Sequence, residues 1–202
     1  MFKQVMALAL VLVFMTSIEA KPFKKVVGES FPAVKVTDLM SGKEVDLTKE
    51  LGKQEIKGAV VTFTCIGCPV AQAYEDRKKE LVAKYGKDFV FLFLNANMGS
   101  ETADAWKDYA KEAGYTGVVA VDEGSKIAEA IGATVTPEVY VVDKSGKVAF
   151  HGPIDDSQDP KYIEVNLLAN ALDALKAGKP IAPDQREVQA FGCGIKMAKA
   201  EQ

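Results

Sequence analysis

The pattern of apolar and polar positions divides the chain into strands and helices. Residues 59–64 and 88–95 are apolar at nearly every position, which is typical of strands buried on both faces of a sheet. Alternation or turn residues predict shorter strands at 31–38, 44–47, 118–121, 138–143 and 147–150. Apolar positions at helical spacing predict helices at 70–85, 101–113, 125–131 and 162–177.

The order of these elements indicates the fold class. Strands and helices alternate until the last two strands, which Lys144-Ser145-Gly146 joins as a hairpin. This order predicts an α/β fold with a mixed central sheet and helices on both faces. In the helix at 70–85 we expect Tyr74 and Tyr85 to be buried and Lys78 to face solvent.

The first twenty residues have the order of a secretory signal peptide. Lys3 precedes the apolar run at 5–15, and Ser17-Ile18-Glu19-Ala20 offers a cleavage site after Ala20. The run is too short to span a membrane, although an uncleaved anchor is the alternative. We therefore expect a signal peptide at 1–20, a domain at 21–180 and a C-terminal tail at 181–202. The mature protein would be periplasmic or secreted, with no membrane span.

Length, net charge and cysteine count limit the classes of function that the chain can have. The chain has 202 residues, enough for one domain with a substantial core, and its net charge of −3 does not indicate nucleic-acid binding. It contains three cysteines, which is one pair plus one left over. Export would place these thiols where disulfides persist.

The first two cysteines form the sequence Cys65-Ile66-Gly67-Cys68-Pro69, directly after the apolar run at 59–64. A strand that ends in a C-x-x-C loop and turns into a helix is a redox arrangement. The helix start carries unpaired N–H groups and a partial positive charge, so we expect a thiolate at this position to be stabilised and its pKa to be lowered. A structural disulfide or half of a zinc site is the alternative.

Several motifs show a resemblance to a known family. They are Cys65-Ile66-Gly67-Cys68-Pro69, Tyr74-Glu75-Asp76-Arg77, Val135-Thr136-Pro137-Glu138-Val139, Gly152-Pro153-Ile154-Asp155-Asp156 and Gly192-Cys193-Gly194-Ile195-Lys196. With these motifs the chain resembles exported redoxins, the group that joins thioredoxin-like reductases to peroxiredoxins of the alkyl hydroperoxide reductase/thiol-specific antioxidant type. The resemblance implies a thioredoxin-like three-layer fold. It also implies a cis peptide at Thr136-Pro137 beside the cysteines, where an extended partner chain could pair.

The first hypothesis is a thiol–disulfide oxidoreductase that needs no cofactor. Cys65 attacks a disulfide of a protein partner, Cys68 resolves the mixed disulfide, and an upstream reductant restores the pair. The second is a thiol peroxidase in which Cys68 attacks a hydroperoxide and Cys65 resolves the sulfenic acid. Peroxiredoxins usually have threonine at the position of Cys65, which weakens this second hypothesis.

A third hypothesis is copper or zinc handling by Cys65, Cys68, Cys193 and His151. Against it, His151 is the only histidine, and a lone histidine at a strand end is usually exposed or hydrogen-bonded.

Two further residues are auxiliary candidates. Cys193 follows the last helix, and the stretch from 178 to 193 can extend roughly 50 Å, so it can reach the active site. It is either a redox thiol or a free or structural cysteine in a docked tail. Arg77 either assists the thiolate or lies at the surface. We expect the loop at 155–159 to be a solvated turn and not a calcium site.

Overall fold

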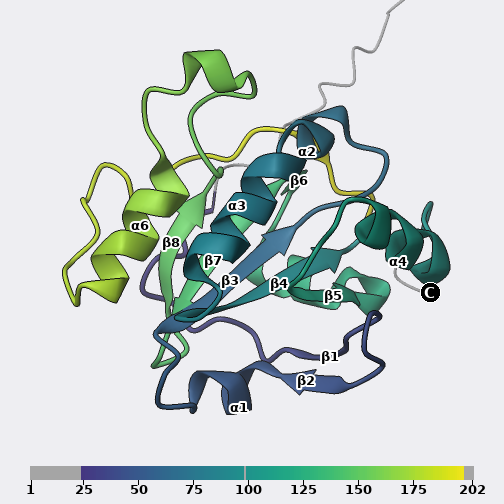
Figure 1. Cartoon of the computed structure of the whole chain (residues 1–202), viewed down its shortest axis with the longest axis horizontal. Coiled ribbons are helices and arrows are strands. Elements are labelled where there is room, and N and C mark those ends of the chain that lie inside the picture. The colour runs from purple at the N-terminus through teal and green to yellow at the C-terminus, as the bar shows by residue number, and fades with distance from the viewer. Residues whose placement is uncertain (1–23, 98, 198–202) are drawn as a thin grey trace, which may run out of the picture.

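The computed structural model describes residues 24–97 and 99–197 (Figure 1). The central sheet has five strands in the order β5-β4-β3-β7-β8. Strands β3, β4 and β5 are parallel, and β7 and β8 are antiparallel to their neighbours. The bounds are β3 Gly58–Phe63, β4 Phe89–Asn95, β5 Val118–Val121, β7 Glu138–Asp143 and β8 Val148–Gly152. The predicted mixed sheet is confirmed, whereas the predicted signal peptide lies outside the described residues.

Helices cover both faces of this sheet, as predicted. One apolar core joins the sheet to α3, α4 and α6, and its largest buried side chain is that of Trp106. The other core joins it to α1, α5 and the β1–β2 hairpin. The bounds are β1 Lys35–Thr37, β2 Glu44–Asp46, α1 Leu47–Leu51, α3 Glu75–Tyr85, α4 Ala103–Glu112, α5 Lys126–Ile131 and α6 Leu167–Lys176. The three layers are those of the thioredoxin-like fold that the resemblance implied.

Predicted elements differ from the observed ones most clearly at three places. The helix at 70–85 is two helices, α2 (Pro69–Ala73) and α3, because the backbone leaves the helical conformation at Tyr74. Tyr74 thereby turns its ring into the core, where its hydroxyl donates to Asp155 Oδ1 at 3.0 Å. The extended stretch expected at 44–47 ends in α1, because Asp46 caps a helix through the Thr48 N–H. Helix α6 starts only at Leu167, since Asp159 instead caps a 3-10 turn over Pro160–Tyr162.

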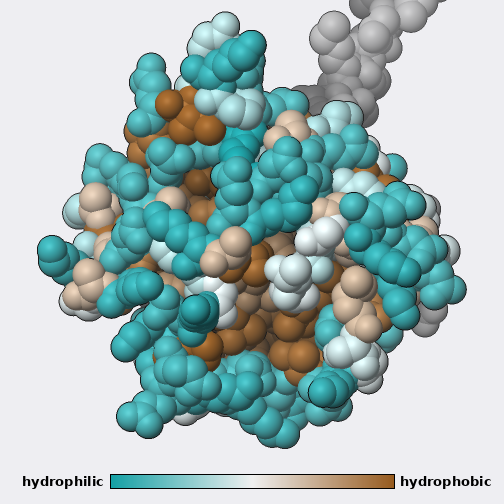
Figure 2. Space-filling model, viewed as in Figure 1, coloured by the Kyte–Doolittle hydropathy of each residue, from teal (hydrophilic) through white to brown (hydrophobic). Residues whose placement is uncertain are grey.

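Hydrophilic and hydrophobic side chains are distributed over the outer surface as the three layers lead one to expect. Figure 2 shows the face that carries α3 as mostly hydrophilic, with hydrophobic side chains gathered in a hollow between α3 and the layer of α1 and β2. Within the described residues, no helix has the length and apolar character needed to cross a bilayer.

Candidate active site

The cysteine loop follows the carboxyl end of β3, the central strand, which is buried at every position. Cys65 and Cys68 are each only 1% exposed. Cys68 is the N-cap of α2, where its sulfur accepts the Ala71 N–H at 3.3 Å and Pro69 occupies the first helical position. The loop thus places both sulfurs inside the protein, with Cys68 at the helix start.

Thr136 contacts both sulfurs. Its peptide bond to Pro137 is cis, which confirms the geometry that the resemblance implied. The Thr136 hydroxyl lies 3.3 Å from Cys65 Sγ, and the Thr136 carbonyl oxygen lies 3.0 Å from Cys68 Sγ, whose thiol donates to it when protonated. The four predicted residues Cys65, Cys68, Thr136 and Pro137 therefore form one cluster.

The C-terminal tail reaches this cluster. Its strand β9 (Cys193–Gly194) pairs antiparallel with β6 (Val135–Thr136), with Cys193 opposite Thr136. In Figure 1 this yellow segment passes beside α2 and β6. The Cys193 side chain packs against Cys65, Cys68 and Ala71. All three thiols of the chain therefore meet at one place.

The ionisation of these thiols differs from one cysteine to the next. Burial raises the pKa of Cys65 to about 11, and the nearby Glu101 charge adds to the rise. Burial also opposes ionisation of Cys68, but hydrogen bonds from Cys193, Thr136 and the Ala71 N–H outweigh it and lower the pKa of Cys68. The hydrogen bond to Cys68 raises the pKa of Cys193 in turn. The lowered pKa expected at the helix start is therefore that of Cys68 and not of Cys65, because Cys68 is the N-cap of α2.

Glu101 holds the loop between the two cysteines, a role that sequence reasoning missed. Its carboxylate accepts the N–H groups of Ile66 and Gly67, each at 3.0 Å, and the side-chain amide of Asn95 at 2.6 Å. The sequence offered Glu101 only as the start of a helix, but α4 begins at Ala103 with Thr102 as its cap. One signal was present: Glu101 follows β4, whose carboxyl end lies beside that of β3.

Lys78 is buried, so the prediction that it faces solvent was wrong. The side chain is 2% exposed, and its ammonium donates to Glu75 Oε1 at 2.8 Å, to the Tyr115 hydroxyl at 2.6 Å and to the Thr64 hydroxyl at 3.3 Å. Burial lowers the pKa of Lys78, although Glu75 and the two cysteines favour its charged form. Because Thr64 directly precedes Cys65, this charged network lies under the cysteine loop.

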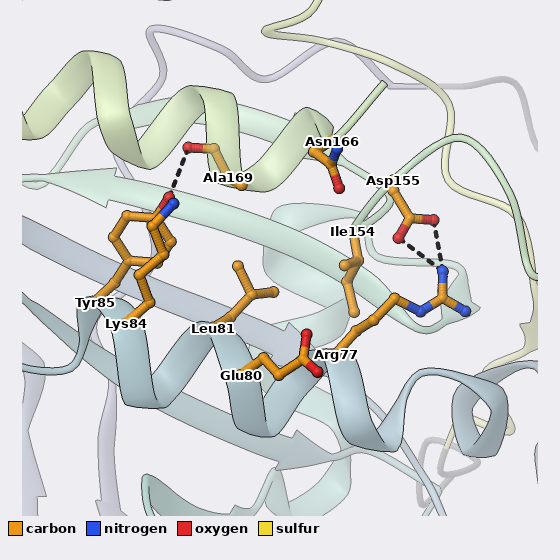
Figure 3. A pocket seen from close by; sticks show the side chains of 9 residues that line it. All are labelled: Arg77, Glu80, Leu81, Lys84, Tyr85, Ile154, Asp155, Asn166 and Ala169. Carbon is orange, nitrogen blue, oxygen red and sulfur yellow. Dashed lines mark hydrogen bonds and ion pairs between the residues drawn. The ribbon is translucent and has the colours of Figure 1, made fainter. Parts of the chain in front are cut away.

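Arg77 neither approaches the thiols nor lies free at the surface. It bonds both carboxylate oxygens of Asp155, at 2.8 and 2.7 Å, and its guanidinium covers the Tyr74 ring at 3.7 Å. Asp155 is itself buried, so the loop expected to be a solvated turn is anchored to α3 at its first residue. Figure 3 shows this pair at one end of a groove between α3 and α6, with Tyr85 and Ala169 at the other end.

His151 does not join the cysteines. It is buried against Tyr140, and its Nε2 lies 2.7 Å from Glu138 Oε1. Over residues 24–97 and 99–197, the structure brings together no group of three or more histidine, cysteine, aspartate or glutamate side chains suited to a metal ion. The ligand set of the metal-handling hypothesis is therefore not assembled.

Comparison with known proteins identifies relatives. Over 126 residues the chain is 32% identical to the thiol-disulfide oxidoreductase ResA of Bacillus thuringiensis, an alignment that covers 62% of this chain and 68% of the relative. An uncharacterised conserved protein of Geobacillus kaustophilus matches in structure with a TM-score of 0.78 and 27% identity, over 90% of this chain and 96% of that one.

The fold has a further match in the exposed lipoprotein thioredoxin Etrx1 of Streptococcus pneumoniae. The TM-score is 0.56 at 21% identity, over 70% of this chain and 99% of the thioredoxin. The family model named Redoxin matches residues 26–171, which include both cysteines of the loop and the cis-proline. With its thioredoxin fold and this match, the chain belongs to the redoxin family of oxidoreductases.

Proposed function

We propose that this protein exchanges thiols and disulfides with protein partners through Cys65 and Cys68. The observation that carries the proposal is the contact of both sulfurs with Thr136, on the strand where a partner chain can pair. The relative ResA is named as an enzyme of this class. No cofactor takes part.

The exchange runs in two steps. The Cys65 thiolate attacks one sulfur of a partner disulfide and releases the other as a thiolate. The Cys68 thiolate then attacks Cys65 Sγ, which releases the second partner sulfur and leaves a Cys65–Cys68 disulfide. An upstream dithiol reduces that disulfide by the same steps, and the reverse sequence oxidises a partner dithiol.

While the C-terminal tail covers the site, the pKa shifts of Cys65 and Cys68 fit their roles as attacking and resolving thiol. The lowered pKa of Cys68 provides a ready thiolate for the resolving step. The pKa of Cys65, raised to about 11, keeps the attacking thiol protonated until a partner displaces the tail and water reaches it. Burial is the main cause of that rise, so displacement of the tail should activate Cys65.

The lowered pKa of Cys68 also favours a second candidate function, the thiol peroxidase. The Cys68 thiolate would attack the terminal oxygen of a hydroperoxide, release water or an alcohol and become a sulfenic acid. Cys65 would then attack the Cys68 sulfur and release water, which again leaves a Cys65–Cys68 disulfide.

Single cysteine variants separate the two functions. In disulfide exchange, Cys65→Ser abolishes reduction of insulin disulfides, whereas Cys68→Ser accumulates mixed disulfides through Cys65 and can be isolated with its partners attached. Both variants are compared with wild type for hydroperoxide consumption with an added thiol. Full hydroperoxide turnover by Cys65→Ser, with no partner trapped by Cys68→Ser, would replace the first function with the peroxidase.

We also propose that the protein is exported by residues 1–20 and that Ala20 precedes the cleavage site. The order of charge, apolar run and small residues supports this proposal. N-terminal sequencing of the mature protein should begin at Lys21, and an intact Met1 on the exported form would contradict it.

A further inference from the structure

We propose that the C-terminal tail is an intramolecular substrate of this site and that Cys193 is its third redox thiol. In the oxidised protein, Cys193 displaces Cys65 from its disulfide with Cys68. A Cys68–Cys193 disulfide forms, and Cys65 becomes a free thiol. The proposal rests on the proposed function, since it needs an active Cys65–Cys68 pair.

The tail occupies the position that a partner chain needs. Strand β9 pairs with Val135 and Thr136, the short strand β6 just before the cis-proline. Beyond it, the Ile195 N–H donates to the Thr134 carbonyl at 2.9 Å and the Lys196 N–H donates to Asn97 Oδ1 at 2.8 Å. A protein substrate can add a strand to this edge only after the tail leaves, because the backbone groups of β6 are already paired.

The tail also presents a sulfur to the pair. Cys193 lies directly across from Thr136, whose backbone carbonyl contacts Cys68. The Cys193 side chain packs on the small cluster of Cys65, Cys68 and Ala71. A substrate cysteine held on the same edge would meet the same two sulfurs.

The exchange needs no further oxidant. Release of a partner leaves the site with a Cys65–Cys68 disulfide. The Cys193 thiolate then attacks Cys68 Sγ. The Cys68–Cys193 bond forms, the Cys65–Cys68 bond breaks, and Cys65 leaves with the electron pair and takes up a proton. The number of disulfides stays at one, so two electrons are neither gained nor lost. The new bond ties the tail to the edge and keeps further partners out until a reductant opens it.

Gly192 allows a test that leaves all three thiols intact. A Cβ atom at Gly192 would lie 2.0 Å from the Thr136 carbonyl oxygen, so Gly192→Ala must displace the tail from β6. Gly194 lies two residues further along, and a Cβ atom there would meet no atom within 4 Å. Gly194→Ala is therefore the matched control, with the same chemical change in the same tail.

The experiment maps the disulfide in the full-length mature protein. Reduced wild type, Gly192→Ala, Gly194→Ala and Cys193→Ser are oxidised with oxidised glutathione, acid-quenched, alkylated and digested without reductant. We expect mainly Cys68–Cys193 in wild type and Gly194→Ala, and mainly Cys65–Cys68 in Gly192→Ala and Cys193→Ser. Insulin reduction should be several-fold faster in the last two, because in neither variant can a disulfide tie the tail to the edge.

The disulfide map of the wild-type protein tests the proposal even if Gly192→Ala does not fold. A Cys65–Cys68 bridge with Cys193 fully alkylated in the wild type, at an unchanged turnover of Cys193→Ser, overturns the role of the tail and leaves the proposed function standing. Failure of the proposed function looks different: insulin disulfides are then not reduced by the wild type or by any variant, and no bridge involves Cys65.

Discussion

Replacing Glu101 by Gln tests how the cysteine loop is held and why Cys65 resists ionisation. The carboxylate accepts two backbone N–H groups, from Ile66 and Gly67, and the Asn95 amide. Glutamine has nearly the same shape, but it offers one acceptor oxygen and an NH₂ group. It can therefore keep at most part of this set, and it removes the negative charge beside Cys65.

The magnitude follows from the bonds that are lost. A hydrogen bond to a charged group contributes about 1.5–3 kcal/mol to the free energy of unfolding. Gly67 is exposed, so water can replace the carboxylate there, whereas Ile66 is half-buried. We expect a loss of about 2 kcal/mol in the free energy of unfolding, and in a protein of this size a fall in Tm of about 4–8 °C.

The same substitution should lower the pKa of Cys65 from its value of about 11, because the Glu101 charge is one cause of the rise. Burial remains, so the pKa should stay above the ordinary value. Thermal unfolding of the reduced protein gives the first readout, and a ¹³Cβ NMR titration of labelled cysteines gives the second without requiring reagent access to the thiols.

Glu112→Gln is the control, since this residue ends α4, the helix that begins two residues after Glu101, and is exposed. It should leave both readouts unchanged. A Tm of Glu101→Gln within about 1 °C of wild type, together with an unchanged Cys65 titration, would refute the reasoning.

Two further predictions concern buried charges. Lys78→Met should cost about 3–5 kcal/mol in denaturant unfolding, because it leaves Glu75 without its ammonium partner; Glu75→Gln added to it should recover part of the loss, and Lys79→Met, at an exposed neighbour, should have little effect. At Glu138, burial opposes ionisation, but bonds from His151 and from the N–H groups of Thr134 and Val135 lower its pKa. Its contribution to stability should be complete above the unfolded pKa of about 4.3 and be lost as pH falls through the lower folded value, so Glu138→Gln should flatten the decline measured between about pH 5 and pH 2.

Much of the fold was predictable because its signal is local. The runs at 59–64 and 88–95 are apolar throughout because β3 and β4 lie between two layers. The position of Thr136 and Pro137 beside the cysteines was predictable only through the family resemblance, since 68 residues separate Thr136 from Cys68.

The buried charges lacked such a signal. Lys78 stands in a charged stretch of a helix, and that pattern indicates solvent. The residues that satisfy it include Tyr115, which lies 37 residues further along the chain and is brought close only by packing. The pairing of the tail with β6 gave no signal either, because β6 and β9 are only two residues long and show no alternation.

The acid–base order of the two cysteines shows most directly what the motif alone leaves undetermined. The motif predicted a stabilised thiolate at the helix start but did not say which cysteine would receive its free N–H groups. In the folded protein the Ala71 N–H goes to Cys68, while the N–H groups of Ile66 and Gly67 are taken by Glu101. Glu101 lies 35 residues beyond Ile66. The ionisation of a C-x-x-C pair therefore depends on which distant side chain accepts the N–H groups of the loop in the folded protein. A carboxylate there competes with the thiolate for the same donors, and it adds a like charge that disfavours ionisation of Cys65.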